Sequence, residues 1–212
     1  MNQKMNQISL KNEIHCKIAH FSLILIPIIY CILGKWISLA IFAVPSIAVV
    51  LLDYMRRTNS AARDVFLRVF GTIIKPHEFD GDKFSSVSWV AFATCLNFLL
   101  FKDEIAVTAF VILVVSDAAA AIVGKNFSSP EFFEKTQNGS LAFLASGFLV
   151  LVICGVAFGS GFWFYLFGLF TLVAVTIVEA RPSLIKVDDN FLIPISFSVI
   201  MTFFDIMWNY AY

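Results

Sequence analysis

The chain has 212 residues, of which 59% are hydrophobic and only 14% are charged. Its 15 basic and 15 acidic side chains give a formal net charge of zero at pH 7, and its mean hydropathy is +0.86. This composition excludes an ordinary water-soluble domain and predicts an all-α integral membrane protein, for which we expect no nucleic-acid partner.

Apolar segments of helical length follow one another along the chain. Each has about 15 to 19 residues, or ~22 to 28 Å of helix, against a hydrocarbon core of ~30 Å. The predicted spanning helices are residues 18–34, 36–52, 87–101, 105–123, 141–158, 162–178 and 191–208. We therefore expect about seven transmembrane helices in a single membrane domain that covers residues 1–212.

The longest predicted connection is the segment 53–86, between the second and third helices. Within it, residues 61–74 interleave Arg63 and Arg68 with hydrophobic side chains, a pattern typical of a helix that lies in the membrane interface. The four cysteines have no metal-ligand spacing, so we interpret them as small packing residues. They are Cys16, Cys31, Cys95 and Cys154.

Basic residues concentrate in alternate connections. A seven-helix topology places 13 of the 15 Lys and Arg residues on one side of the membrane. The positive-inside rule then predicts a cytoplasmic N-terminus and places Tyr212 outside. We expect no cleaved signal peptide, because no small-residue cleavage site follows the first apolar segment.

Asp117 follows Ser116 inside the apolar segment 105–123. An aspartate at the centre of a spanning helix is unfavourable by roughly 2.5 to 3.5 kcal/mol on insertion scales, so we interpret Asp117 as functional. The alternative is a protonated or paired structural residue. Ala120, Ala121 and Gly124 follow on the same helical face, and such small residues suit either close helix packing or a bound ligand.

The predicted loop 124–140 contains Lys125 and Lys135, and it ends in Asn138-Gly139-Ser140 where the next helix begins. Free backbone amides and the positive end of the helix dipole favour phosphate, and glycine permits a close approach of the backbone. The alternative is that Ser140 or Asn138 only caps the helix.

A third polar cluster joins the last two predicted helices. Glu179 ends one helix, and Asp188, Asp189 and Asn190 precede the next. Oxygen ligands of this kind suit Mg²⁺ or Mn²⁺, and Mg²⁺ commonly takes one or two carboxylates together with substrate phosphates. The alternative is helix capping by Asp189 or Asn190 and a surface pair between Glu179 and Arg181. All three clusters are predicted on the cytoplasmic side.

Together these motifs resemble the CTP-dependent lipid kinases, which include dolichol kinase, phytol kinase and the fungal-type diacylglycerol kinase and are distantly related to phosphatidate cytidylyltransferase. The matching segments are 116–125, 135–143, 178–180 and 188–194, with Glu13, Lys17, His20 and residues 53–56 as further similarities. The chain departs from the family at Asn138, where glutamate is usual, at Cys16, where arginine is frequent, and at Lys125, which replaces arginine.

The resemblance implies transfer of the γ-phosphate of a nucleotide, CTP in this family, to the hydroxyl of a polyprenol, phytol-like alcohol or diacylglycerol at the cytoplasmic face. It implies Asp117 as metal ligand or base, Lys135 as a catalytic phosphate-neutralising group, and Mg²⁺ or Mn²⁺ as cofactor. The other implied metal or nucleotide ligands are Glu179, Asp188, Asp189 and Asn190. The remaining implied phosphate contacts are Lys17, His20, Lys125, Asn138, Gly139 and Ser140.

Two other functions stay open. A phosphatidate cytidylyltransferase would use similar lysines, carboxylates and Mg²⁺ but would release pyrophosphate. A small transporter or lipid flippase would use Asp117 as a proton or ion site. Against transport, the outer half of the predicted bundle has few polar residues, chiefly Thr108 and Asp205, and Asp205 is expected to face the interface.

Overall fold

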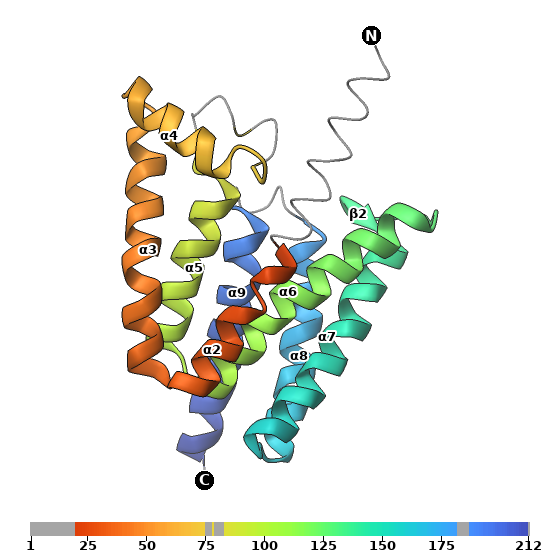
Figure 1. The fold of residues 1–212 in the computed structure, drawn as a ribbon. Helices are drawn as coiled ribbons and strands as arrows, with labels where there is room; N and C mark the ends of the chain where they lie inside the picture. The colour runs from red at the N-terminus through yellow and green to blue at the C-terminus, as the bar shows by residue number, and fades with distance from the viewer. Residues whose placement is uncertain (1–19, 75–77, 79–82, 182–186, 212) are drawn as a thin grey trace. The chain divides into compact units, whose positions relative to one another are not determined.

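The computed structural model describes residues 20–74, 78, 83–181 and 187–211, with side chains up to Trp208. The helices are α2 (Leu25–Leu33), α3 (Lys35–Met55), α4 (Ser60–Phe70), α5 (Ser86–Leu100), α6 (Asp103–Asn126), α7 (Gln137–Phe158), α8 (Phe162–Glu179) and α9 (Asp189–Ala211) (Figure 1). A short hairpin, β1 (Glu131–Phe132) and β2 (Lys135–Thr136), joins α6 to α7.

The protein is an all-α multi-pass membrane protein by the length and composition of its helices. Within the described residues, α3, α6, α7, α8 and α9 are long and apolar enough to cross a bilayer, and His20–Leu33 and Ser86–Leu100 are shorter apolar helices. Each of the seven predicted apolar segments therefore contains a helix, but only five of these helices have full spanning length. The two shorter ones correspond to ~21 and ~22 Å at 1.5 Å per residue.

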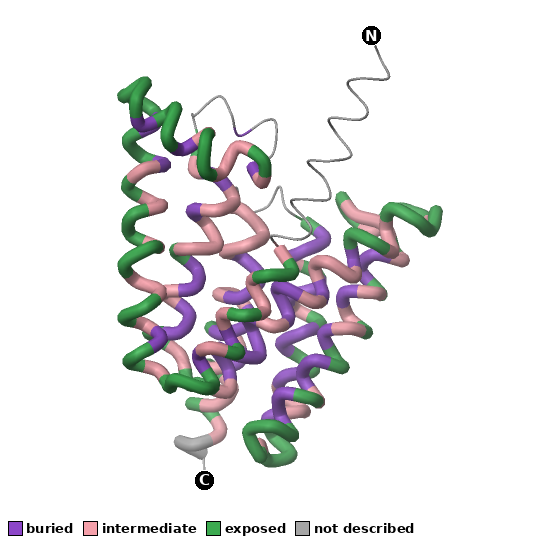
Figure 2. Tube along the Cα trace, in the orientation of Figure 1, coloured by how far each residue is buried: buried purple, intermediate pink, exposed green. Residues whose placement is uncertain are grey.

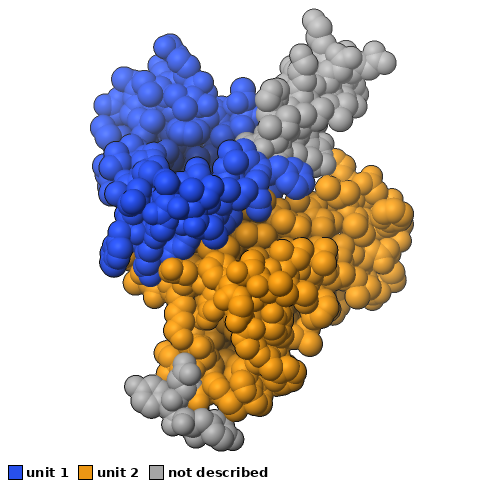
Figure 3. Space-filling view, turned by 60° about the horizontal axis from the view of Figure 1, so that its bottom comes forward, with its two compact units in different colours: residues 1–95 blue, residues 96–212 orange. Residues whose placement is uncertain are grey.

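The chain divides into two compact units, Met1–Cys95 and Leu96–Tyr212 (Figure 3). In the first unit, Gly34 ends α2 with a φ of 78°, a conformation that favours glycine, and its amide donates to the Tyr30 carbonyl at 2.9 Å. The predicted amphipathic segment 61–74 forms α4, which begins one residue earlier and ends at Phe70. Asn59 caps α4, and Phe66 and Ala62 form its buried face.

A buried ion pair within the segment 53–56 stabilises this first unit. Asp53 and Arg56 are 0% and 4% exposed and pair directly. The second carboxylate oxygen of Asp53 accepts hydrogen bonds from the amide and hydroxyl of Ser85, at 2.8 and 2.7 Å, and from the Ser88 hydroxyl. Arg56 also donates to the Glu78 carbonyl at 2.9 Å. Both carboxylate oxygens of Asp53 therefore have an ion-pair or hydrogen-bond partner, which a buried charge requires.

In the second unit, α6 is the central helix. In the most apolar 18-residue stretch of α6, 61% is buried inside the protein, compared with 33–39% in the corresponding stretches of α7, α8 and α9. Figure 2 shows the resulting buried stretch along α6, which packs against α7 and α9 while α8 lies between those two helices. A polar link joins α5, α6 and α9, because Asn97 donates to the Ala106 carbonyl at 2.8 Å and accepts from Ser198 at 2.6 Å.

Glycines let α7 and α8 approach closely in this unit. A Cβ atom added at Gly147 would lie 2.5 Å from a Leu172 methyl carbon, and one added at Gly168 would lie 2.5 Å from a Leu151 methyl carbon. Each leucine therefore fills the space that a glycine on the facing helix leaves open. This is the small-residue packing typical of membrane helices.

We predict that Asp53→Asn lowers the free energy of unfolding by about 3 kcal/mol, because it leaves the buried Arg56 guanidinium without a counter-charge. Denaturant unfolding in detergent measures the change. Asp64→Asn, at an exposed position on α4, is the matched control and is expected to have little effect. Equal stability of the two variants would contradict a stabilising role for the pair.

Candidate functional site

Residues from two predicted clusters meet at one end of the second unit. The ammonium nitrogen of Lys135, on β2, lies 2.8 Å from a Glu179 carboxylate oxygen and 3.5 Å from an Asp189 carboxylate oxygen. Glu179 is the last residue of α8, and Asp189 is the first residue of α9. The loop and the acidic cluster, which are separate in the sequence, therefore form one site.

The hairpin fixes the position of Lys135. Phe132 on β1 pairs with Lys135 on β2, and the turn between them places Phe133 at a φ of 56°. The Glu134 amide donates to the Ala180 carbonyl at 3.0 Å, which connects the hairpin to the end of α8. The surface pair between Glu179 and Arg181, which was the alternative to a metal site, is not formed. Instead, the Arg181 guanidinium lies over the Phe133 ring at 4.0 Å and Glu179 pairs with Lys135.

Glu179 is buried, at 1% exposure, and one of its carboxyl oxygens contacts Lys135. Its second oxygen, Oε2, has no hydrogen-bond partner among the described residues, and neither has Oδ1 of Asp189. Buried oxygens normally have a partner, so two such carboxylate oxygens beside one lysine mark a place where a ligand can bind. The Ser140 hydroxyl, 5% exposed, also lacks a partner within the described part of the chain.

Asp117 interacts electrostatically with the cluster of Lys135, Glu179 and Asp189. Its charge acts on Lys135, Glu179 and Asp189, although it lies on α6. Burial lowers the pKa of Lys135, but Glu179, Asp189 and Asp117 outweigh this effect and raise the pKa above its ordinary value of 10.5. Lys135 is therefore an ammonium ion at neutral pH, opposed by three carboxyl groups.

The start of α7 corrects the prediction of free backbone amides. Thr136 is the N-cap, and its hydroxyl accepts from the Gly139 amide at 3.2 Å. The Asn138 amide donates to the Ser129 hydroxyl at 3.0 Å, and the Gln137 amide donates to the Pro130 carbonyl at 3.0 Å. The Asn138 and Gly139 amides therefore already have acceptors in this structure, and phosphate binding by the Gly139 and Ser140 amides stays a prediction. Neither Ser140 nor Asn138 is the cap; the spacing from Thr136 to Gly139 is the signal that the sequence offered.

Close packing explains part of the small-residue face of α6. A Cβ added at Gly139 would lie 3.2 Å from the Ala120 carbonyl oxygen, and one added at Gly124 would lie 3.5 Å from the Gly139 Cα atom. Ala120, Gly124 and Gly139 thus form the contact between α6 and α7, and Ala121 is exposed. Gly124 and Lys125 belong to α6 rather than to a loop, and Lys125 is exposed in its last turn.

The remaining predicted metal and phosphate ligands are not part of the ion pairs between Lys135, Glu179 and Asp189. Asp188 caps α9, since its Oδ1 atom accepts from the Asn190 amide at 3.0 Å and from the Asn190 side chain at 2.7 Å. His20 belongs to the first unit, and Lys17 lies outside the described residues. Within the described ranges, no three Asp, Glu, His or Cys side chains are arranged so that they could hold a metal ion. The predicted five-residue metal set is therefore not assembled as one cluster.

Comparison with known proteins identifies one relative of nearly the same extent. The chain is 28% identical over 190 residues to the uncharacterized protein RP860 of Rickettsia prowazekii (strain Madrid E). This alignment covers 89% of the present chain and 92% of that protein, so the likeness includes both compact units. No family model matches the chain, and no solved structure matches it.

We predict that Lys135→Met lowers the melting temperature at pH 7, because Glu179 and Asp189 lose their cation. The folded-state pKa of Lys135 is raised, so its contribution to stability is complete below pH ~10.5 and is lost as the pH rises through the raised value. The difference from the wild type should therefore shrink in alkaline solution.

Melting temperatures between pH 7 and 11 test this prediction, with the exposed Lys125→Met as control. Two results would contradict an electrostatic role of Lys135 in stability. One is a melting-temperature difference between Lys135→Met and the wild type that stays constant up to pH 11. The other is the same melting temperature for Lys135→Met and Lys125→Met at every pH.

Proposed function

We propose that this chain is a membrane-embedded lipid kinase that transfers the γ-phosphate of a nucleotide, preferentially CTP, to the hydroxyl of a lipid alcohol. The observation that carries the proposal is the meeting of Lys135, Glu179 and Asp189, with two buried carboxylate oxygens lacking partners among the described residues. These residues come from the segments on which the resemblance to CTP-dependent lipid kinases is based.

The proposed topology has seven membrane helices, a cytoplasmic N-terminus and an external C-terminus. The two helices shorter than 18 residues fit a bilayer that thins locally around them. The end of the second unit that contains Lys135 also contains Lys125 and Arg181, while Lys102 belongs to its opposite end. The positive-inside rule assigns the Lys135 end to the cytosol, where the nucleotide is available.

In this mechanism Lys135 neutralises charge on the transferred phosphate, and its release from Glu179 and Asp189 accompanies nucleotide binding. Phosphoryl transfer depends mainly on positioning and charge neutralisation, so the site needs no covalent nucleophile. Asp117 takes the proton of the lipid hydroxyl while the hydroxyl oxygen bonds to the γ-phosphorus. The bond from the γ-phosphorus to the bridging oxygen breaks, and the nucleoside diphosphate leaves.

The donor atoms fit a magnesium ion that binds together with a nucleotide. Glu179 Oε2 and Asp189 Oδ1 are carboxylate oxygens without partners in the described part of the chain, and one or two carboxylates are what Mg²⁺ takes beside substrate phosphates. Mg²⁺ or Mn²⁺ bound there would neutralise charge that develops on the phosphate oxygens. We assign Glu179 and Asp189 as the ligands, with Asp117 facing the acceptor hydroxyl.

A radiolabel assay tests the reaction. The purified protein in lipid, with Mg²⁺, receives γ-labelled CTP or ATP and polyprenol, phytol or diacylglycerol in turn. We expect label in the lipid, preferentially from CTP. A CDP-lipid formed from α-labelled CTP and phosphatidate would instead identify a cytidylyltransferase. The absence of both products with every pair would contradict catalysis and favour transport.

We predict that Asp117→Asn reduces phosphate transfer by about 10²–10⁴-fold, the usual contribution of a positioned acid or base, while the protein stays inserted and folded. Label incorporation and thermal unfolding measure the two properties. Glu131→Gln, which removes an exposed carboxylate in the hairpin, is the matched control and should retain activity. Near-normal activity of Asp117→Asn would exclude Asp117 as the base.

A further inference from the structure

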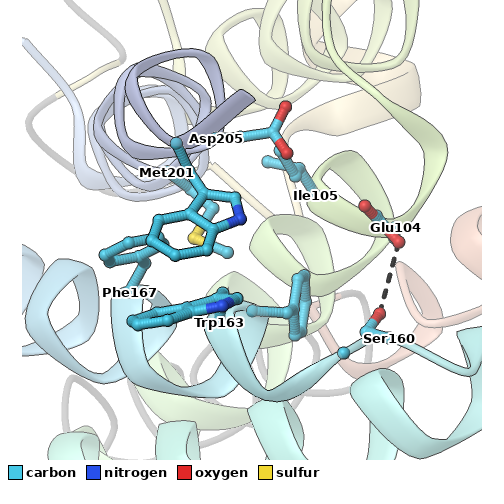
Figure 4. A pocket seen from close by; sticks show the side chains of 10 residues that line it. Glu104, Ile105, Ser160, Trp163, Phe167, Met201 and Asp205 are labelled. Carbon is cyan, nitrogen blue, oxygen red and sulfur yellow. Dashed lines mark hydrogen bonds between the residues drawn. The ribbon is translucent and has the colours of Figure 1, made fainter. Parts of the chain in front are cut away.

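A cavity lies at the end of the second unit opposite the Lys135 site, between the first turns of α6 and α8 and the last part of α9. Its volume is about 160 Å³, which is smaller than the ~300 Å³ of the smallest drug-sized pockets. Glu104 and Asp205 contribute carboxylates to its lining, and Trp163, Phe167 and Trp208 contribute aromatic rings. Figure 4 shows Glu104 and Asp205 beside Ile105, with Trp163 and Phe167 across from them.

The two carboxylates have different partners. Asp205 pairs with Lys102 at 2.6 Å, and the Lys102 side chain is 54% exposed outside the cavity lining. Glu104 accepts a hydrogen bond from the Ser160 hydroxyl at 3.2 Å and has no ion pair with any described residue. No basic side chain is among the described residues that line the cavity. Among the described residues, the lining therefore carries one carboxylate, that of Glu104, without a counter-charge, which favours a cationic ligand.

The aromatic wall indicates what kind of cation fits. The Trp163 ring centroid lies 3.8 Å from that of Trp208 and 5.6 Å from that of Phe167, which is stacked on Trp163. Aromatic faces attract organic ammonium groups, whereas Ca²⁺ takes six to eight oxygen ligands. Tryptophan is common at membrane interfaces in any case, but that preference does not account for two carboxylates around the same small space.

We propose that this cavity binds an organic ammonium group of headgroup size, with Glu104 as its counter-charge and the Trp163 side of the cavity as its apolar wall. The ammonium can come from the headgroup of a choline or ethanolamine lipid or from a free amine. The cavity and the Lys135 site are at opposite ends of the helices, so this proposal does not depend on the kinase activity.

Tryptophan fluorescence tests the proposal in phosphatidylglycerol nanodiscs. Replacing Trp36 and Trp89 by Phe leaves Trp163 and Trp208 as the only emitting tryptophans. We expect choline chloride to change their emission in a saturable manner that sodium chloride at equal ionic strength does not reproduce. Glu104→Gln should weaken the apparent affinity about tenfold, corresponding to ~1.4 kcal/mol.

Asp103→Asn is the matched control, because Asp103 is the exposed neighbour of Glu104 and does not line the cavity. The affinity of this variant for choline should differ less than twofold from that of the wild type. Asp205→Asn provides a second variant of the lining if Glu104→Gln fails to fold, and it should also weaken binding. Unchanged affinity in the folded lining variant would overturn the proposal.

Nanodiscs of phosphatidylcholine or phosphatidylethanolamine distinguish the two sources of the ammonium. If a lipid headgroup occupies the cavity, the emission shifts without added choline and free choline no longer titrates. If a free amine is the ligand, choline titrates equally in both kinds of nanodisc. Identical responses to choline and sodium chloride, together with no effect of the lipid headgroup, would overturn the proposal.

Discussion

The ion pair between Lys135 and Glu179 is the interaction on which the candidate site depends. Glu179 is almost completely buried, and a buried carboxylate without a partner is strongly unfavourable. The pair requires β2 to reach the end of α8, and the hydrogen bond from Glu134 to Ala180 holds the hairpin there. The same arrangement leaves one Glu179 oxygen and one Asp189 oxygen without partners in the described chain, so the ion pair and the candidate ligand site use different oxygens of the same two carboxylates.

Close contact between α6 and α7 limits how this site can be built. Gly124 and Gly139 allow the two helices to approach, and Thr136 caps α7 at the same place. The start of α7 is consequently used for packing and capping, and the proposed phosphate binding therefore relies on side chains. Lys135 is the cation that can neutralise phosphate there, which makes its exchange between carboxylates and nucleotide the central step of the proposed reaction.

Hydrophobic segment length predicted much of the fold. Each of the seven apolar segments contains a helix, because a long and predominantly apolar run is a strong local signal of a membrane helix. The hairpin was missed because strands of two residues leave no such period. The Asp53–Arg56 network was missed for a different reason: its partners Ser85 and Ser88 are more than 30 residues away in sequence, and only the folded chain brings them together.

The candidate site was predicted in composition more accurately than in geometry. Carboxylates and lysines of separate motifs indicated a shared position, and Lys135, Glu179 and Asp189 lie together in the structure, while their role as a functional site stays a prediction. The roles of neighbouring residues were not readable from the sequence. Asp188 is identified as the α9 cap, and Gly139 as a packing contact, by hydrogen bonds and distances that composition does not specify.

Manganese binding followed by electron paramagnetic resonance tests the central claim most directly. Mn²⁺ is titrated into the purified protein with and without CTP, and the titration is repeated with Glu179→Gln. The account predicts that CTP increases the amount of protein-bound Mn²⁺ and that this increase is lost in the variant. Binding that is independent of CTP, or unchanged by Glu179→Gln, would show that the Lys135–Glu179–Asp189 cluster is a structural ion pair and not a nucleotide–metal site.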